Sequence, residues 1–138
     1  QLANDLLNVT SFLRKTLDLP EQLRIRIAKT KGRGNSGAYS HGFQAAVIDP
    51  RGDRKSVLET VMHELVHAEQ YHTGRLVHDV VVSKNNSVRW IHEWKGKPIT
   101  SKGATYNSYR NLPHEKEAFA RQGALGKKLA KAINAKRK

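Results

Sequence analysis

A chain of 138 residues has the length of one ordinary domain, and we expect a single domain over residues 1–138, because smaller units would bury too little surface. The chain contains no cysteine, which excludes disulfides, thiol nucleophiles and cysteine-ligated zinc. Lys and Arg number 25 against 12 Asp and Glu, and the formal net charge of +13 predicts attraction to a polyanion, such as a nucleic acid, or to an acidic protein surface.

The first half of the chain predicts a helix, a strand, a loop, a strand and a second helix. Leucines at helical spacing predict the first helix over residues 3–17, and alternating apolar and basic residues predict a strand over residues 23–28 with one cationic face. Three glycines mark residues 31–40 as a loop, and the apolar run at 43–48 predicts a second strand. Apolar positions covering about half a helical circumference predict the central helix over residues 54–71.

The second half predicts a hairpin and a last helix. Two β-rich runs, residues 76–82 and 88–94, are joined by a short polar turn, residues 95–112 are irregular, and a helix begins after Pro113 and ends in a basic tail at 127–138. This order of elements is typical of a compact α+β domain, in which helices at the N-terminus, middle and C-terminus pack against one small, mainly antiparallel sheet.

The central helix, which Asp53 is placed to cap, contains the HExxH pattern in residues 63–67. Histidines four positions apart lie about 40° from each other around a helix, so His63 and His67 can reach one zinc ion. Glu64 directly follows the first histidine, where its carboxylate can take a proton from an attacking water without binding the metal. The alternative interpretation is a pair of surface histidines on an amphipathic helix.

A hydrolytic zinc site needs a third protein ligand. The pattern HExxHxxGxxH is excluded because its glycine and final histidine are replaced here by Gln70 and Thr73. His72 lies on the apolar side of the helix, and we interpret it as a helix-end histidine. The remaining candidates all lie downstream of the central helix: His78, His92, Glu93, His114, Glu115 and Glu117.

Residues 112–120, LPHEKEAFA, resemble the start of the C-terminal helix in small gluzincin metallopeptidases, including minigluzincins and phage-encoded zinc peptidases. The resemblance implies a zincin-like fold in which HExxH supplies two zinc ligands and its glutamate the general base. It further implies that the third ligand is a glutamate on the last helix, here Glu115 or Glu117. Glu115 shares the inward face of that helix with Ala118 and Gln122, so we expect Glu115 to be the ligand.

Two departures from known families bear on this expectation. Gluzincins often carry Asp or Asn four residues after the ligand glutamate, where this chain has Phe119, so the group that orients the ligand is unidentified. Residues 67–71, HAEQY, also resemble the HExxHAxxY start of SprT-like proteases, which act on DNA-bound proteins. The cysteine-containing zinc ribbon often found in those proteins is missing here.

A peptidase of this kind binds its substrate in an extended form along an edge strand, and we expect residues 43–48 to form that edge. A second hydrogen-bond donor should stabilise the oxyanion that forms during peptide hydrolysis. Tyr106, Tyr109 and His114 precede or begin the last helix and are candidates, although each could equally serve in packing. We prefer Tyr109 for this catalytic role.

Aromatic and basic residues are interleaved in the predicted hairpin. Trp90, His92 and Trp94 fall on one strand face beside several basic residues, a mixture that could stack on single-stranded bases. An aromatic stripe on a strand is more often part of the core, and we favour that interpretation for the tryptophans.

The sequence therefore predicts a zinc metallopeptidase that acts on a protein or peptide. The alternatives are a nucleic-acid-binding module with a structural or vestigial metal site, or a protease acting on nucleic-acid-bound proteins. No apolar run approaches the roughly 18 residues of a membrane span, and the N-terminal residues lack the order of a signal peptide. We therefore expect no membrane partner and a cytoplasmic location, the host cytoplasm if the protein is viral.

Overall fold

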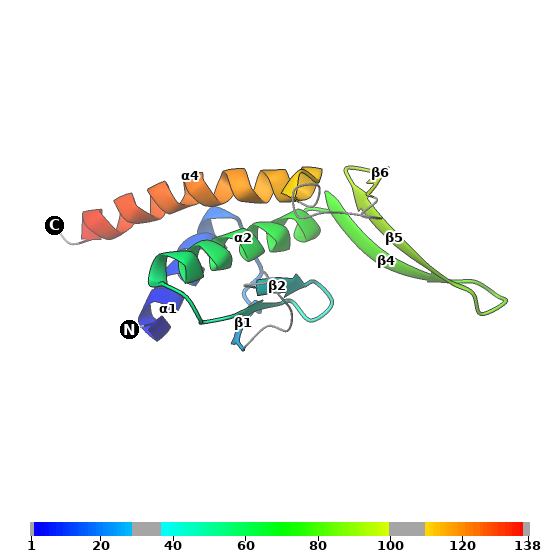
Figure 1. Cartoon of the computed structure of the whole chain (residues 1–138), viewed down its shortest axis with the longest axis horizontal. Helices are drawn as coiled ribbons and strands as arrows, with labels where there is room; N and C mark the ends of the chain where they lie inside the picture. Colours follow the sequence, from blue (N-terminus) through cyan, green and yellow to red (C-terminus); the bar gives the residue numbers. More distant parts are fainter. Residues whose placement is uncertain (1, 29–36, 100–109, 137–138) are drawn as a thin grey trace.

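The computed structural model describes residues 2–28, 37–99 and 110–136, which form the expected α+β fold. Helix α2 lies between helix α4 and the first of two small sheets, and the second sheet projects beyond the end of α2 (Figure 1). The three helices fall where the sequence predicts them. The elements are α1 (Leu2–Thr16), β1 (Arg24–Ile27), β2 (Gly37–Ser40), β3 (Ala45–Ile48), α2 (Arg54–His72), β4 (Leu76–Val82), β5 (Val88–Trp94), β6 (Lys97–Pro98) and α4 (Pro113–Lys136).

Helix α2 is the centre of the molecule, in contact with α1, α4, β2 and β3. Its N-terminus is capped as expected, because the Asp53 carboxylate accepts a hydrogen bond from the Ser56 backbone N–H at 2.8 Å. Gly74, just past its C-terminus, has a φ of +79°, a conformation that glycine adopts without strain. Every residue from 64 to 70 is buried, so the polar side chains in this stretch must find partners inside the protein.

The hydrophobic core lies around α2 and includes residues from all three helices and the first sheet. Helix α1 contributes Val9 and Leu13, which pack with Val61 and Leu65 of α2, and an ion pair between Asp5 and Arg54 fixes α1 beside the start of α2. The rest of the core comprises Leu17, Leu19, Leu23, Ala46, Ile48, Val57, Met62, Val66, Ala68, Ala118, Leu125 and Leu129.

The first sheet has the strand order β1-β3-β2, with β3 parallel to β1 and antiparallel to β2. Residues 37–40, expected as the end of a loop, form the edge strand β2, and residues 43–48, expected at the edge, provide the central strand. Phe43 is 84% exposed and Gln44 has a φ of +47°, so both belong to the turn before β3. The error arises because the strand preference of a short segment depends on its context, and pairing with a strand distant in the sequence decides its structure.

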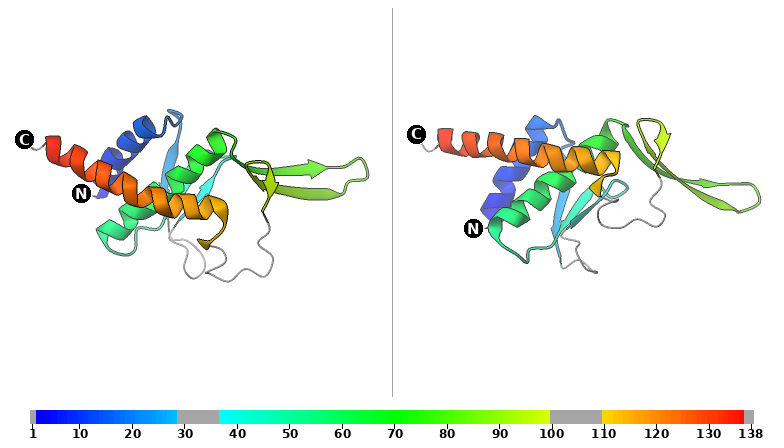
Figure 2. Two further views of the ribbon diagram at one scale, coloured as in Figure 1. Left: turned by 90° about the horizontal axis from the view of Figure 1, so that it is seen from above. Right: turned by 45° about the horizontal axis from the view of Figure 1, so that its top comes forward.

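The second sheet is antiparallel, in the order β4-β5-β6, and its first two strands form the hairpin that the sequence predicts. It is separate from the first sheet, whereas we expected one sheet. Lys97 and Pro98 form β6 within a segment that we expected to be irregular, because the turn at Lys95 and Gly96 folds the chain back onto β5. The β4–β5 hairpin extends away from the helices as an arm (Figure 2).

The tryptophans of β5 have different environments. Trp94, at the base of the hairpin, is 9% exposed and contacts the guanidinium of Arg75, so it is buried as expected. Trp90 is 66% exposed, which corrects the expectation that both tryptophans cover the core. The projection of the hairpin beyond the helices leaves nothing among the described residues to cover Trp90.

Among the residues that the structure describes, no helix has both the length and the apolar character needed to cross a bilayer.

Candidate metal centre

Three side chains from two helices converge beside α2. Glu115 Oε1, from the first turn of α4, lies 2.8 Å from His63 Nε2 and 3.1 Å from His67 Nε2, and the two Nε2 atoms are 3.2 Å apart. Their ligating atoms all lie within 4.8 Å of one another, and all three side chains are largely buried. Two imidazole nitrogens and a carboxylate oxygen in this arrangement could hold a metal ion.

Gln70 fixes the orientation and tautomer of His67. Its Nε2 donates to the backbone carbonyl of His114 at 3.0 Å, and a carbonyl can only accept. Gln70 Oε1 is thereby turned toward His67 Nδ1 at 2.7 Å, so that Nδ1 must carry the proton and donate it. In its neutral form, His67 therefore has the Nε2 lone pair available for a metal ion.

Gln122 forms the corresponding hydrogen bond with His63, since its Oε1 lies 2.8 Å from His63 Nδ1. Phe119 occupies the position where gluzincins often have Asp or Asn, and its ring packs on that of His63 at a centroid distance of 4.5 Å. The polar contact to the histidine thus comes from one turn further along α4, and the aromatic ring holds the imidazole in place from the side.

The cluster favours positive charge. Burial by itself lowers the pKa of the His67 imidazole, but its hydrogen bond to Glu115 and the charge of that carboxylate outweigh burial and raise the pKa above its ordinary value. With Nδ1 committed to Gln70, the second proton sits on Nε2, between His67 and Glu115. The same three donor atoms, 2.8–3.2 Å apart, could share a metal ion in place of this proton, so the residues fit the metal that the pattern implies.

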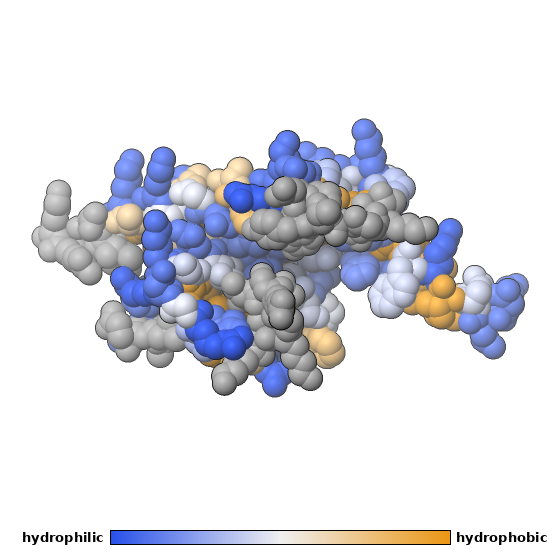
Figure 3. All heavy atoms as spheres, in the orientation of Figure 1, coloured by the Kyte–Doolittle hydropathy of each residue, from blue (hydrophilic) through white to orange (hydrophobic). Residues whose placement is uncertain are grey.

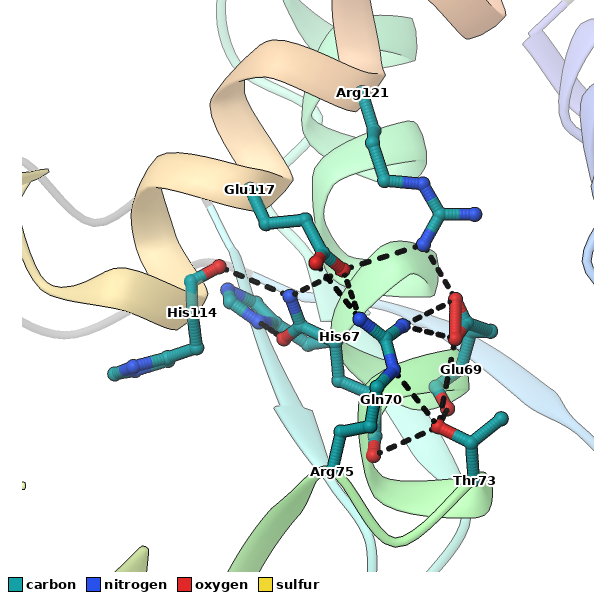
Figure 4. A network of polar contacts seen from close by, with 8 residues as sticks. All are labelled: His67, Glu69, Gln70, Thr73, Arg75, His114, Glu117 and Arg121. Carbon is teal, nitrogen blue, oxygen red and sulfur yellow. Dashed lines mark hydrogen bonds and ion pairs between the residues drawn. The ribbon is translucent and has the colours of Figure 1, made fainter. Parts of the chain in front are cut away.

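Glu117, the alternative third ligand, is held elsewhere by an ion-pair network (Figure 4). Both of its carboxylate oxygens accept from Arg75 Nη1 at 2.7 Å, and Arg121 bridges it to Glu69, which Arg75 also contacts. Burial tends to raise the pKa of Glu117, but its hydrogen bonds to Arg75 and Gln70 and the nearby charges lower it. Glu117 therefore stays ionised, ties the end of α2 to the start of α4, and thereby holds Glu115 over the two histidines.

A pocket of about 270 Å³ opens beside the cluster, and Glu64, His67 and Glu115 all line it. Glu64 is only 7% exposed. Burial raises the pKa of the Glu64 carboxyl, and the Glu115 carboxylate adds to the rise, while His67 and His63 oppose it. A carboxylate with a raised pKa is a stronger base, so Glu64 is suited to accept a proton from a molecule in this pocket.

Strand β2 forms one wall of the pocket through Gly37, Ala38 and Tyr39. A Cβ atom at Gly37 would lie 2.8 Å from Thr60 Cγ2, 2.9 Å from the Val47 carbonyl oxygen and 3.3 Å from Glu64 Cγ. The strand therefore passes so close to α2 that only glycine fits, and this close approach sets the position of the wall relative to Glu64.

Substitution Gly37→Ala should displace β2 from α2 and destabilise the protein by about 1–3 kcal/mol. The new Cβ would clash with Thr60 Cγ2 and with the Val47 carbonyl oxygen, and the latter is part of the backbone and cannot move freely. Urea unfolding followed by circular dichroism measures the change. Gly42→Ala is the matched control, because a Cβ at Gly42 meets nothing within 4 Å. Equal unfolding midpoints for the two variants would show that β2 does not press on α2 as described.

The opposite wall is formed by the base of the hairpin and the first turn of α4, through Leu76, His78, His92 and His114. Burial is the main reason that the pKa of His114 is lowered to about 4, so this imidazole is neutral at pH 7. Its Nδ1 is buried without a hydrogen-bond partner in the part of the chain that the structure describes. Burial, followed by the charge of His78, also lowers the pKa of His92.

The other sequence candidates contribute nothing to the described cluster. Tyr106 and Tyr109 lie outside the described residues, so the catalytic role of Tyr109 stays a prediction. His72 is the last residue of α2, as expected, but it is exposed, although we placed it on the apolar side of the helix. Glu93 pairs with Val77 on the hairpin face away from His92. Sequence reasoning missed Gln70 and Gln122 as partners of the histidines, although Gln122 was placed on the inward face. It also missed Tyr39 and Tyr71, which line the pocket.

Comparisons of the chain with protein-family models, curated proteins and solved structures return no match. The interpretation of the site therefore depends on its own geometry.

Proposed function

We propose that the protein is a zinc-dependent metallopeptidase of the gluzincin type, with His63, His67 and Glu115 as the metal ligands. The observation that carries the proposal is the position of the buried Glu64 carboxylate in the same pocket as His67 and Glu115, two members of the His-His-Glu cluster. Zinc is the metal proposed, because two imidazoles and one carboxylate with an open further position are the ligand set of hydrolytic zinc sites.

When bound, zinc would act as a Lewis acid that polarises the scissile carbonyl and makes water a better nucleophile. Glu64 accepts a proton from the attacking water as the C–O bond forms, and then delivers this proton to the amide nitrogen as the C–N bond breaks. Glu64 returns to its carboxylate form at the end of the cycle. Two peptide fragments leave with the atoms of one water divided between them.

Strand β2 is the edge along which an extended substrate would pair, in place of residues 43–48. It is the outer strand of the first sheet and contributes Gly37, Ala38 and Tyr39 to the pocket. Among the described residues, the donor on the pocket wall best suited to a developing oxyanion is the hydroxyl of Tyr71. Burial raises the pKa of Tyr71, which keeps the hydroxyl protonated at neutral pH.

The proposal is favoured over a structural metal in a nucleic-acid-binding module by two features of the site. A structural zinc is normally closed by four protein ligands, whereas the described residues supply three. The cluster also borders a pocket of about 270 Å³ into which the Glu64 carboxylate is built, a feature that a structural site does not need.

Metal removal tests the proposal. The purified protein should contain one zinc per chain by elemental analysis and should cleave casein. Dialysis against a chelator should abolish cleavage and lower the melting temperature. A metal ion whose free concentration is 1,000 times its Kd stabilises the folded state by about 4 kcal/mol, and its removal takes this stability away. Added zinc should restore both properties, and magnesium neither. Cleavage that survives complete metal removal would contradict the proposal, as would the absence of any zinc binding by the folded protein.

A further inference from the structure

Four apolar side chains are exposed together on one face of the β4–β5 arm. Val80 pairs with Trp90 and Val82 with Val88, and alternation along the strands puts all four on the same side of the sheet. Their exposed fractions are 46% for Val80, 66% for Trp90, 64% for Val82 and 58% for Val88. We call these four residues the hairpin face. In Figure 3 hydrophobic residues occupy the middle of the arm and hydrophilic ones its tip.

The hairpin face continues into the pocket beside Glu64. His78 and His92, the next pair on the same side of the sheet, line both the base of the arm and the pocket wall. A row of rings connects the two regions. Centroid distances are 5.2 Å from Trp90 to His78, 5.1 Å from His78 to His92, 5.4 Å from His92 to His114 and 5.7 Å from His114 to His67. A continuous row of side chains therefore leads from the metal cluster to Trp90 and the exposed valines beside it.

We propose that the hairpin face binds an extended apolar segment of a protein substrate, next to the peptide bond that is cleaved. This inference rests on the proposed peptidase function. The distance along β4 from His78 to Val82 is about 13 Å, which matches roughly four residues of extended chain. The substrate class is accordingly an unfolded protein or exposed tail with an apolar stretch beside the cleavage site, rather than a short peptide that occupies the pocket alone.

The composition of the surface favours a polypeptide over the other macromolecules that could cover it. Neither β4 nor β5 contributes a Lys or Arg to this side, and Arg89 pairs with Val81 on the opposite side. Arg75 and Lys95 lie over Trp94 at the base of the arm, four residues along β5 from Trp90, so the hairpin face itself offers phosphates no cation from its own strands. A second copy of the chain is also disfavoured. Four partly exposed side chains supply well under the roughly 800 Å² that each partner buries in a stable interface.

The test compares substitutions on the two sides of the arm. Val80→Ser combined with Trp90→Ser removes apolar surface from the hairpin face, and Val81→Ser combined with Arg89→Ser changes the neighbouring pair on the opposite side. Reduced and carboxymethylated α-lactalbumin serves as an unfolded protein substrate, and a five-residue peptide that spans one of its cleavage sites serves as the short substrate. Both are assayed in 0.3 M NaCl, which screens attraction to the basic protein.

We expect the first pair of substitutions to lower kcat/KM about tenfold for the unfolded protein and to leave the short peptide unchanged, while the second pair affects neither. The same substitutions in a zinc-loaded Glu64→Gln background should weaken binding of labelled α-lactalbumin about tenfold in fluorescence anisotropy. If the Val80→Ser, Trp90→Ser variant cleaves and binds the unfolded protein as the wild type does, the proposed docking surface is wrong and the peptidase proposal is unaffected. Hairpin-dependent binding without cleavage by the wild type would overturn the peptidase function instead.

Two further outcomes would also overturn the proposal. One is a dimer in sedimentation velocity that the hairpin-face substitutions convert to a monomer, which would assign the surface to self-association. The other is binding of single-stranded DNA that depends on Trp90 while protein cleavage does not, which would assign it to nucleic acid.

Discussion

Substitution Glu64→Gln is expected to lower the rate of peptide cleavage by a factor of 10² to 10⁴, about 3 to 5 kcal/mol of transition-state stabilisation, while the protein keeps its zinc. Glutamine has nearly the shape of glutamate, so the pocket is preserved, but its amide cannot accept the proton of the attacking water. Glu64 is not one of the three clustered ligands, and its loss should leave metal affinity nearly unchanged. Casein cleavage and zinc content, measured on the same preparation, separate the two effects.

The stability of the zinc-free variant provides an independent check. The pKa of Glu64 is raised in the folded protein, so the folded state favours the protonated carboxyl, and ionisation at neutral pH costs stability. The neutral glutamine avoids this cost, and the variant should melt at or above the wild-type temperature at pH 7. Glu59→Gln, on an exposed position of the same helix, is the matched control and should change neither cleavage nor zinc content. If Glu64→Gln cleaves casein as fast as the Glu59 variant, Glu64 is not the base.

The HExxH pattern could be interpreted from sequence because its information is local. Helical geometry alone brings His63 and His67 to one side of α2, and the same argument from periodicity placed Glu115 on the inward face of α4. The contact between Glu115 and the histidines depends on how two helices pack. The sequence could predict the faces that meet, and the structure supplies their register, including the contacts of Gln70 and Gln122.

The errors share a different physical origin. Residues 37–40 become a strand because they pair with the free edge of β3, and their own sequence, Gly-Ala-Tyr-Ser, does not identify that partner. Alternation along β5 correctly put Trp90 and Trp94 on one side of a strand, but it carries no information about what lies opposite. The first turn of α4 lies beside Trp94 through His114, whereas no helix covers Trp90 among the described residues. The sequence could therefore not predict that the hairpin face is exposed, although it showed which residues share that side of the strands.

A comparison of Glu115→Gln with Glu117→Gln decides which glutamate is the metal ligand. Glu115→Gln removes the only carboxylate of the three-residue cluster and should weaken zinc binding by at least about 100-fold. Glu117→Gln leaves the cluster intact but weakens the ion pairs with Arg75 and Arg121, which should cost about 1–2 kcal/mol of stability. Zinc affinity is measured by competition with a chromophoric chelator, and the stability of the zinc-free proteins by urea unfolding.

Glu115→Gln should thus mainly lose zinc affinity, and Glu117→Gln should mainly lose stability. Both variants change one carboxylate to an amide within the same helical turn. Because the Glu117 network ties α4 to α2, a small loss of zinc affinity, up to a few fold, is expected in Glu117→Gln from the reduced rigidity of the cluster. Comparable losses of zinc affinity in both variants would mean that Glu115 is not a ligand in its own right. If Glu115→Gln kept the wild-type zinc affinity, the assignment of a His-His-Glu site would be wrong, because the two imidazoles from one helix would then hold the metal without Glu115.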